Sequence, residues 1–357
     1  MKLRLLFLCP LLLCPTLWAS NSQLPANFKS LPDDVQALLL EYAFFSQQVK
    51  DHWGGDAEFA AQKEYVKYLD DYLSRAVVDY ERGLLRVETL ATSEPTKQLE
   101  EAIITTLLTP QDPNGVDIFS ARNIQTGGKP FLQGLILDEN NQAITSAWRA
   151  RMFARYLIEH HLQVRKTAKG ELYSVTAPMV ASHTKVAANN VMDQVQAAAQ
   201  RFSLPPSLIL GIIETESGFN PYAVSAANAY GLMQVVPSTA GADYFQKILK
   251  KSGQPSRNYL LQPENNIMAG SGYIAILRDY YLNKVEDPYS LLYCIISAYN
   301  GGAGNVYKTF SADRNQAVNV INNMSSDQVL WHLQHKHPSD ESRRYLQKVL
   351  AHQEKYY

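Results

Sequence analysis

The sequence predicts an α+β protein of two domains, a mixed α/β domain followed by an all-α domain. Its 357 residues exceed what one hydrophobic core usually serves, since domains commonly hold about 100–200 residues. Strand-like patterns occur in the first half only and fade after about Lys185. The remaining sequence shows helical spacing, interrupted by loops rich in Gly, Pro and Asn.

In the first domain, which we assign to residues 20–182, helices and strands are mixed. The helical spacing of Tyr65, Tyr68 and Tyr72 predicts a helix over 57–76. The other expected helices are 31–49, 96–108 and 147–161, the expected strands are 84–90 and 172–180, and a hairpin is expected between 131–137 and 143–145.

The second domain, residues 183–357, is expected to be entirely helical. The boundary falls between Met179 and Val186, after the last strand-like pattern. The predicted helices are 186–202, 206–217, 263–282, 288–299, 313–323 and 340–355.

The composition is that of a globular protein without a strong affinity for nucleic acid. Hydrophobic residues make up 46% of the chain and charged residues 19%, which argues against extensive disorder. The formal net charge is −1 and no long run of one sign occurs, whereas nucleic-acid binding needs a basic face. This charge balance is compatible with a neutral or sugar-like substrate.

Residues 1–19 have the layout of a secretory signal peptide. Lys2 and Arg4 precede an apolar run over 5–13, and small residues follow near Ala19. The run is too short to span a membrane comfortably. The alternative, a buried N-terminal helix, fits the charged start less well. We therefore expect export to a periplasm-like space and cleavage near Ala19.

The cysteines bear on disulfides and on lipid attachment. Cys9 and Cys14 lie inside the signal segment, so a chain cleaved near Ala19 keeps only Cys294 and forms no internal disulfide. A lipid at Cys14 would tie the protein to a membrane, but this cysteine follows leucines where a small residue is usual. A soluble product is favoured over a lipoprotein, and outer-membrane association stays open.

The segment 208–221 places a carboxylate, Glu216, at the end of a strongly apolar helix. Partial desolvation and the negative end of the helix dipole both raise the pKa of a carboxyl there, as a general acid near neutral pH requires. Glu214 lies two residues earlier, hence on roughly the opposite side of the helix, so the two do not pair. The alternative is that both are ordinary exposed glutamates at a frayed helix end.

Two later segments supply the other groups that a sugar site uses. Residues 230–234 read Tyr-Gly-Leu-Met-Gln, and residues 297–304 close an apolar helix with Tyr299, Asn300 and a glycine-rich turn. Phosphate binding by this turn is disfavoured, because no strand–loop–Lys pattern accompanies it. Each segment is a weak signal alone, but together with Glu216 they provide an acid, amides and aromatic rings.

Glu216-Ser217, 231–234 and 298–302, in this order and at these distances, resemble the signature of the lytic transglycosylases with a goose-type lysozyme fold. Further segments resemble the membrane-bound type C members of that family: 65–68, 87–91, 214–225 and 337–346. The resemblance covers nearly the whole chain after the signal segment. It implies a type C N-terminal domain followed by a lysozyme-like catalytic domain.

The resemblance also implies residue roles around one acid. Glu216 matches the family's only catalytic acid/base, Ser217 would orient it, and Tyr345 matches a late tyrosine that helps set its protonation. Phe219 and Tyr222 are interpreted as core residues rather than as part of the site wall.

The remaining implied roles concern substrate binding. Met233 and Gln234 would line the site, and Tyr299 and Asn300 would face the sugar beside the scissile bond. With a single acid, the implied reaction breaks the bond between N-acetylmuramic acid and N-acetylglucosamine without water and leaves a 1,6-anhydro end. A hydrolytic goose-type lysozyme would need a second acid to position water, and none is evident. A catalytically silent peptidoglycan-binding protein would lack Glu216 or the Tyr299–Asn300 pair.

No cofactor and no metal ion are expected. His160 and His161 are adjacent on a helix and face different directions, and His335 and His337 lack a zinc-type pattern. Peptidoglycan strands are the expected partner, and other cell-wall enzymes stay open. The N-terminal half would shape the site, dock a partner or hold the enzyme near its substrate. We expect residues from Val186 onward to fold alone and to keep some activity.

Overall fold

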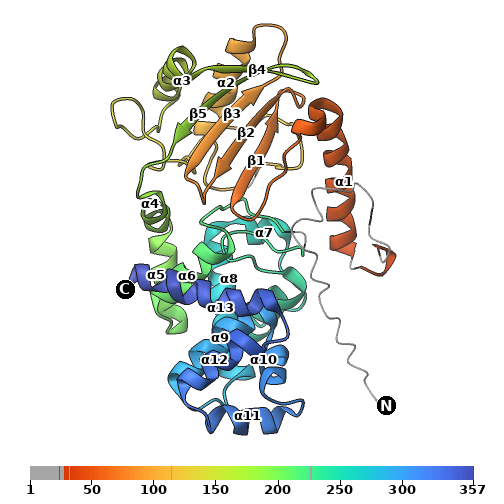
Figure 1. Cartoon of the computed structure of the whole chain (residues 1–357), viewed down its shortest axis with the longest axis vertical. Helices are drawn as coiled ribbons and strands as arrows, with labels where there is room; N and C mark the ends of the chain where they lie inside the picture. The colour runs from red at the N-terminus through yellow and green to blue at the C-terminus, as the bar shows by residue number, and fades with distance from the viewer. Residues whose placement is uncertain (1–23, 25–27, 32, 114, 226) are drawn as a thin grey trace.

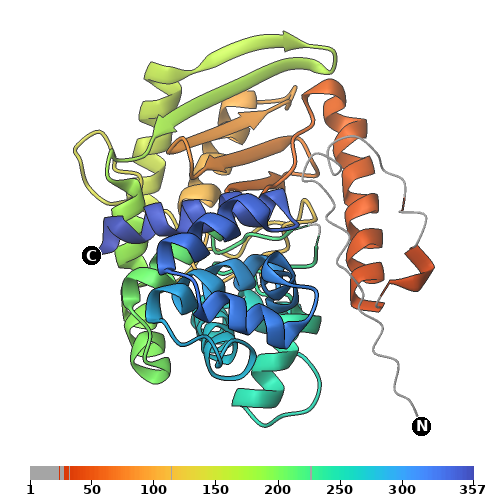
Figure 2. The ribbon, with the colours of Figure 1, turned by 60° about the horizontal axis from the view of Figure 1, so that its bottom comes forward.

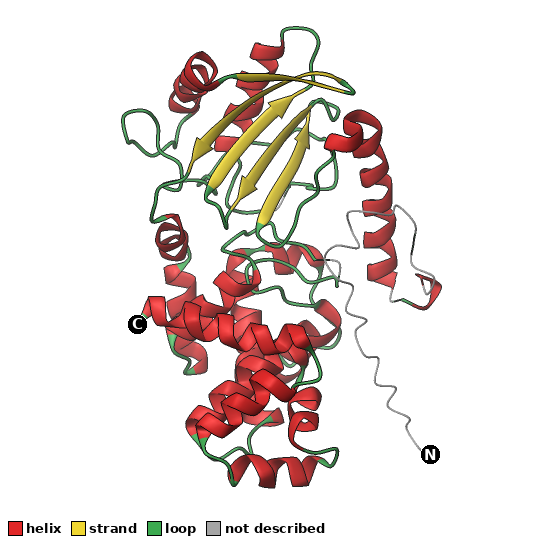
Figure 3. Cartoon of the chain, in the orientation of Figure 1, coloured by secondary structure: helices red, strands yellow, loops and turns green. Residues whose placement is uncertain are grey.

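The computed structural model describes residue 24 and residues 28–31, 33–113, 115–225 and 227–357 (Figure 1). The predicted signal peptide, with Cys9 and Cys14, lies outside these residues. Within them, no helix has the length and the hydropathy needed to cross a bilayer. The predicted α+β class is confirmed, since the N-terminal half holds an antiparallel sheet and the C-terminal half is built on helices (Figure 3).

The sheet consists of five antiparallel strands in the order β1-β2-β3-β5-β4. Their bounds are β1 Glu64–Leu69, β2 Ser74–Asp79, β3 Leu84–Thr89, β4 Gln163–Thr167 and β5 Gly170–Pro178. The helices of this half are α1 Asp33–Trp53, α2 Pro95–Leu107 and α3 Ala147–His161, with short 3₁₀ turns at Phe28–Ser30 and Gly54–Asp56. Helices α2 and α3 pack together against strands β2, β3 and β5, and α1 lies at the β1 edge.

The predicted helix over 57–76 is wrong, because these residues form β1 and β2. Strand β1 is buried on both faces from Tyr65 to Leu69, so its sequence shows no alternation of polar and apolar residues. Asp70, Asp71 and Tyr72 then adopt left-handed backbone conformations, with φ of 52°, 48° and 68°, and turn the chain back into β2. Strand β4 was not anticipated either.

The predicted hairpin at 131–145 is reduced to one bridge between Leu137 and Ala143, around a tight turn at Asp138. The loop before it is fixed from the sheet. Lys67, fully buried on β1, donates hydrogen bonds to the carbonyl oxygens of Asp117 and Ser120 at 2.9 and 2.5 Å. Burial lowers the pKa of Lys67 to about 8. The long loop is therefore held by a buried cation as well as by the antiparallel bridge between Pro110 and Pro130.

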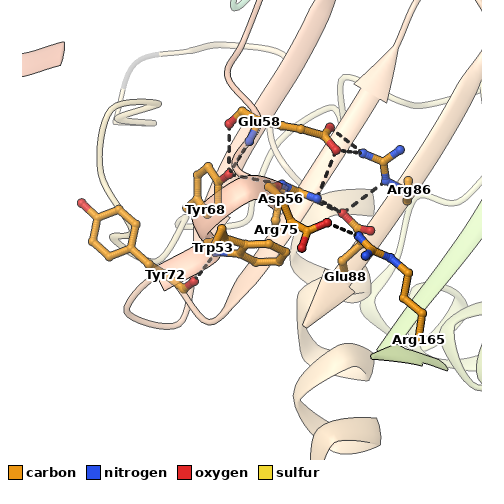
Figure 4. A network of polar contacts seen from close by, with 9 residues as sticks. All are labelled: Trp53, Asp56, Glu58, Tyr68, Tyr72, Arg75, Arg86, Glu88 and Arg165. Atoms are coloured by element: carbon orange, nitrogen blue, oxygen red, sulfur yellow. Dashed lines mark hydrogen bonds and ion pairs between the residues drawn. The ribbon is translucent and has the colours of Figure 1, made fainter. Parts of the chain in front are cut away.

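The end of α1 is fastened to the sheet by a buried ion pair (Figure 4). Arg75 on β2 stands opposite Glu88 on β3 and donates to its carboxylate from Nε at 2.9 Å. The guanidinium also lies 4.2 Å from the ring centroid of Trp53 and donates to the carbonyl oxygen of Asp56 at 2.6 Å. Because an unpaired buried charge costs several kcal/mol, loss of either partner would loosen the segment after α1.

The C-terminal half contains ten helices among the residues described. They are α4 His183–Asn190, α5 Met192–Phe202, α6 Pro206–Glu216, α7 Arg257–Leu261, α8 Pro263–Ile276, α9 Pro288–Gly301, α10 Ala303–Phe310, α11 Arg314–Asn322, α12 Ser326–Lys336 and α13 Asp340–Gln353. Short π-helical segments occupy Pro237–Gly241, Tyr244–Ile248 and Leu277–Tyr281, and a 3₁₀ turn, Glu354–Tyr356, follows α13. The predicted helix over 186–202 is divided at Val191, and α7, α10 and α12 were not anticipated.

Helix α6 is the centre of this half, because every residue from Ser207 to Glu214 is buried. It begins at a proline, whose fixed φ suits the first helical turn. Helix α13 crosses it at Gly211. A Cβ atom on Gly211 would lie 3.0 Å from the backbone nitrogen of Gln353 and 3.1 Å from the carbonyl oxygen of Val349. The two backbones approach this closely only because Gly211 has no side chain.

The two halves meet around the loop that follows α6. The Tyr222 ring packs against Tyr65 at 5.1 Å and Phe131 at 5.5 Å between centroids, and its hydroxyl donates to the carbonyl oxygen of Pro110. Phe219 and Tyr222 are buried, as the sequence predicted. A fragment beginning at Val186 would expose the Tyr222 ring, and its independent folding stays a prediction.

Replacing Gly211 with Ala should lower the free energy of unfolding by about 2–3 kcal/mol, because the new methyl group meets the backbone of α13. Urea unfolding of the full chain would measure this. Gly304→Ala on α10 is the matched control, since no atom lies within 4 Å of the added Cβ; it should change stability by at most about 1 kcal/mol, in the favourable direction. Equal stabilities for the two variants would contradict the close crossing.

Candidate active site

Glu216 is the last residue of α6, and its carboxyl faces α13. The hydroxyl of Tyr345 donates a hydrogen bond to Glu216 Oε1 at 2.7 Å. Burial raises the pKa of Glu216 to about 8, and the negative charge of Glu341 adds to the shift. The Tyr345 hydrogen bond and the positive charge of Lys63 act in the opposite direction and are outweighed. The carboxyl therefore holds its proton near neutral pH, as a general acid must.

Local backbone geometry ends α6 at this residue. Gly218 and Phe219 adopt positive φ angles of 59° and 71°, so the chain cannot continue as a right-handed helix. Ser217 is fully buried, and its hydroxyl lies 2.8 Å from the carbonyl oxygen of Leu232 and 3.1 Å from that of Ile213. Ser217 thus joins the end of α6 to the segment 231–234. It positions Glu216 through the backbone.

Glu214 has partners different from those of Glu216. It accepts hydrogen bonds from Lys355 Nζ at 2.6 Å and from the Tyr356 hydroxyl at 2.7 Å. It is buried rather than exposed at a frayed helix end. Glu214 thereby holds the C-terminal residues against α6 and leaves Glu216 to face Tyr345.

The segment 231–234 is held in place by Asn266 on α8. Asn266 accepts a hydrogen bond from the Met233 backbone N–H at 2.7 Å and donates to the carbonyl oxygens of Tyr230 and Leu260, both at 2.6 Å. A Cβ atom on Gly231 would lie 2.5 Å from the Asn266 amide nitrogen, so only glycine fits there. Sequence reasoning missed Asn266; its one signal is an amide directly before the apolar part of the helix.

The side chains of Met233 and Gln234 differ in what they reach. Met233 is fully buried against α8 and presents its carbonyl oxygen, which accepts a hydrogen bond from the Tyr299 hydroxyl at 2.9 Å. The Gln234 amide donates to the carbonyl oxygens of Ala223 and Gly231 at 3.2 and 3.0 Å. These contacts place Met233 in the core and Gln234 across the turn that it belongs to.

Tyr299 and Asn300 end α9 beside the same acid. Burial raises the pKa of Tyr299 well above its ordinary value, and the charge of Glu216 adds to this effect. The Asn300 amide donates to Glu341 Oε1 at 3.1 Å, and its oxygen accepts a hydrogen bond from the Ser342 hydroxyl at 2.7 Å. Asn300 is therefore oriented by the first turn of α13.

Glu341 is a second carboxylate near Glu216, and sequence reasoning missed it. It lies four residues before Tyr345, one helical turn away on the same face of α13. Its negative charge raises the pKa values of both Glu216 and Tyr345. The available signal was the four-residue spacing of Glu341 and Tyr345 in the predicted helix over 340–355, which places both on one face. Across the described part of the chain, no three His, Cys, Asp or Glu side chains gather as a metal site would require.

Comparison with known proteins identifies the relatives of this arrangement. Residues 32–190 match the family described as membrane-bound lytic murein transglycosylase C, N-terminal domain, and residues 193–322 match the transglycosylase SLT domain. A protein from Yersinia enterocolitica named membrane-bound lytic murein transglycosylase C is 43% identical over 356 residues, covering 99% of this chain and 98% of that protein. The chain belongs to the membrane-bound lytic murein transglycosylase C family.

Another family member, from Yersinia pestis, is 45% identical over 314 residues, or 87% of each chain. Solved structures are less similar. An inactive variant of the lytic transglycosylase Slt from Pseudomonas aeruginosa is 25% identical with a TM-score of 0.36, covering 46% of this chain, which spans 23% of that protein. In the present chain, Glu341 and Tyr345 follow the stretch that matches the SLT domain. Helix α13 therefore completes the site from outside that stretch.

Replacing Tyr345 with Phe should move the pKa of Glu216 upward by about one unit, because the lost hydrogen bond stabilises the ionised carboxylate. A ¹³C NMR titration of the carboxyl, assigned by comparison with Glu216→Gln, would measure the shift. Tyr280→Phe removes a hydroxyl from a tyrosine that is 52% exposed and should leave the titration unchanged. A downward shift in Tyr345→Phe would show that the hydroxyl favours the protonated acid instead.

Proposed function

We propose that this chain, a peptidoglycan lytic transglycosylase, uses Glu216 as its single acid/base to cut the bond between N-acetylmuramic acid and N-acetylglucosamine. The observation that carries the proposal is the partly buried Glu216 carboxyl, whose pKa is raised to about 8 and which accepts a hydrogen bond from Tyr345. Membership of the transglycosylase C family gives the substrate class. The reaction serves the turnover or remodelling of the cell wall.

The proposed reaction has two proton transfers through one carboxyl. Protonated Glu216 donates to the glycosidic oxygen, and the bond to C1 of the muramyl sugar breaks as the leaving sugar takes that proton. The neighbouring N-acetyl group stabilises the oxocarbenium-like centre, as in substrate-assisted glycosidases. Ionised Glu216 then removes the proton of the muramyl C6 hydroxyl, whose oxygen attacks C1. The product is a 1,6-anhydro end, and no water is consumed.

The electrostatics of the site suit both proton transfers of this reaction. Burial and the Glu341 charge keep the acid protonated before cleavage. Once Glu216 is ionised, the Tyr345 hydrogen bond and the Lys63 charge stabilise the anion. A pKa near the working pH serves an acid that must become a base in the same turnover.

The other site residues take supporting roles in this proposal. Tyr299 and Asn300 face the muramyl sugar, and Gln234 contacts the glycan strand beside that sugar. Met233 contributes through its backbone carbonyl group, which Tyr299 holds. Ser217 keeps the end of α6 in place. No cofactor or metal ion takes part in the proposed steps.

A hydrolytic lysozyme is the second candidate, because Glu341 provides a carboxylate near Glu216. Its Oε1 atom is engaged by the Asn300 amide, which leaves it as an electrostatic partner of Glu216 rather than a free base. The identity of the released ends separates the two reactions. A catalytically silent binding protein is disfavoured, since the acid and its tyrosine partner are in hydrogen-bond contact.

The domain and location assignments belong to this proposal. We propose a signal peptide over 1–19, an N-terminal domain over 20–182 and a catalytic domain over 183–357; the last strand ends at Pro178 and α4 begins at His183, which supports the boundary. We propose that the signal directs export to the periplasm; relatives named membrane-bound support association with a membrane, for which we propose the outer membrane. Other cell-wall enzymes stay open as partners.

Mass spectrometry of muropeptides released from purified peptidoglycan tests the reaction. The mature protein should release anhydromuramyl ends, and Glu216→Gln should lower the rate by at least about 10²-fold, because an amide cannot donate the proton. Glu214→Gln is the matched control on the same helix, and it should still release anhydromuramyl ends. Reducing ends would indicate a lysozyme, and no release by the unaltered protein would indicate a binding protein.

A further inference from the structure

Basic side chains continue the face of α13 that carries Tyr345. Lys348, His352 and Lys355 follow Tyr345 at intervals of three, four and three residues, which places all four on one face. The contacts agree: Tyr345 reaches Glu216, His352 Nδ1 lies 3.0 Å from the Thr215 hydroxyl, and Lys355 reaches Glu214. This face therefore lies along the end of α6, and in the view of Figure 2 α13, in deep blue, lies between the sheet and the other helices.

The N-terminal half adds a third lysine, Lys63, at the same place. A Cβ atom on Gly218 would lie 3.4 Å from Lys63 Cγ, so the Lys63 side chain packs against the backbone two residues after Glu216. Burial lowers the pKa of Lys63; the negative charges of Glu81 and Glu214 oppose this effect, and the positive charges of Lys348 and Lys355 add to it. Lys63 and α13 thus approach Glu216 from two different halves of the chain.

Among these three lysines, only Lys355 has a close anionic partner within the described residues. Lys355 is engaged by Glu214 at 2.6 Å. Lys63 has only a loose contact of 3.9 Å with Glu81, a side chain that is 75% exposed. Among the residues described, Lys348 has no acidic partner within ion-pair distance and is exposed. Lys63 and Lys348 therefore have ammonium groups that an incoming anion can reach without breaking a close ion pair.

The substrate supplies a matching anion beside the scissile bond. In peptidoglycan, the lactyl group of each muramyl sugar carries a stem peptide with free carboxylates. Since Glu216 acts at the muramyl C1–oxygen bond in the proposed function, the attached stem leaves the sugar close to Glu216. We propose that Lys63 and Lys348 bind carboxylates of this stem peptide and give the enzyme a preference for strands with acidic stems. This inference rests on the proposed function.

The test compares two substrates that differ only in charge. One is purified glycan strands with natural stems, and the other is the same strands after conversion of the stem carboxylates to primary amides. The measured quantity is the ratio of kcat/KM for the acidic strands to kcat/KM for the amidated strands, determined for the full mature chain, Lys348→Gln, Lys63→Gln and the double variant. Lys97→Gln, which alters an exposed lysine on α2 that pairs with Glu94 at 3.2 Å, is the matched control.

The unaltered protein should prefer the acidic strands by roughly fivefold to tenfold, and each lysine variant should reduce the preference by roughly threefold, as expected for charge pairs at a surface. The double variant should show a ratio near one, and Lys97→Gln should keep the full preference. High salt should reduce the preference of the unaltered protein as well.

Two results would overturn the inference: a ratio near one in the unaltered protein, or lysine variants that slow both substrates equally. Lys348→Gln is the more telling variant, because Lys348 is not among the groups that shift the pKa of Glu216, whereas Lys63 is. Failure of the proposed function has a different signature, namely no anhydromuramyl ends from either substrate.

Discussion

The close crossing of α6 and α13 at Gly211 is the contact on which the site depends. One helix carries Glu216 at its end, the other carries Tyr345, and their 2.7 Å hydrogen bond exists because the two backbones meet without a side chain between them. The same crossing sets the first turn of α13 beside Asn300, through Glu341 and Ser342. Glu216 and Tyr345, 129 positions apart in the sequence, are thus aligned by one glycine.

This alignment has an energetic cost, because it raises the pKa of Glu216; the same raised pKa lets Glu216 act as a general acid. Burial raises the pKa of Glu216 from its ordinary value near 4.5 to about 8. The ionised form is therefore less favourable in the folded protein than in the unfolded chain, and the stability lost to it grows as the pH rises from about 4.5 to above 8. Glu214, two residues earlier, instead pairs with Lys355 and Tyr356. Neighbouring glutamates on one helix thus have separate tasks.

The N-terminal half contributes to this environment as well as covering apolar surface. Its sheet packs aromatic rings around Tyr222, and the Arg75–Glu88 pair fastens the end of α1 to the sheet, next to the segment that leads to Lys63. The positive charge of Lys63 then acts on Glu216. The geometry favours the first of the three roles considered for this half, that it shapes the site.

The sequence by itself was enough to place the acid at the end of an apolar helix, to separate a mixed half from a helical half, and, through the family signature, to select Tyr345. These features depend on neighbours in the chain and on hydrophobic spacing. Tertiary structure alone decided the rest. The sequence did not reveal strands β1 and β2, because burial of β1 on both faces removed the alternation that marks a strand. Asn266, Glu341 and Lys63 reach the site only because distant segments pack together, and Met233 points into the core for the same reason.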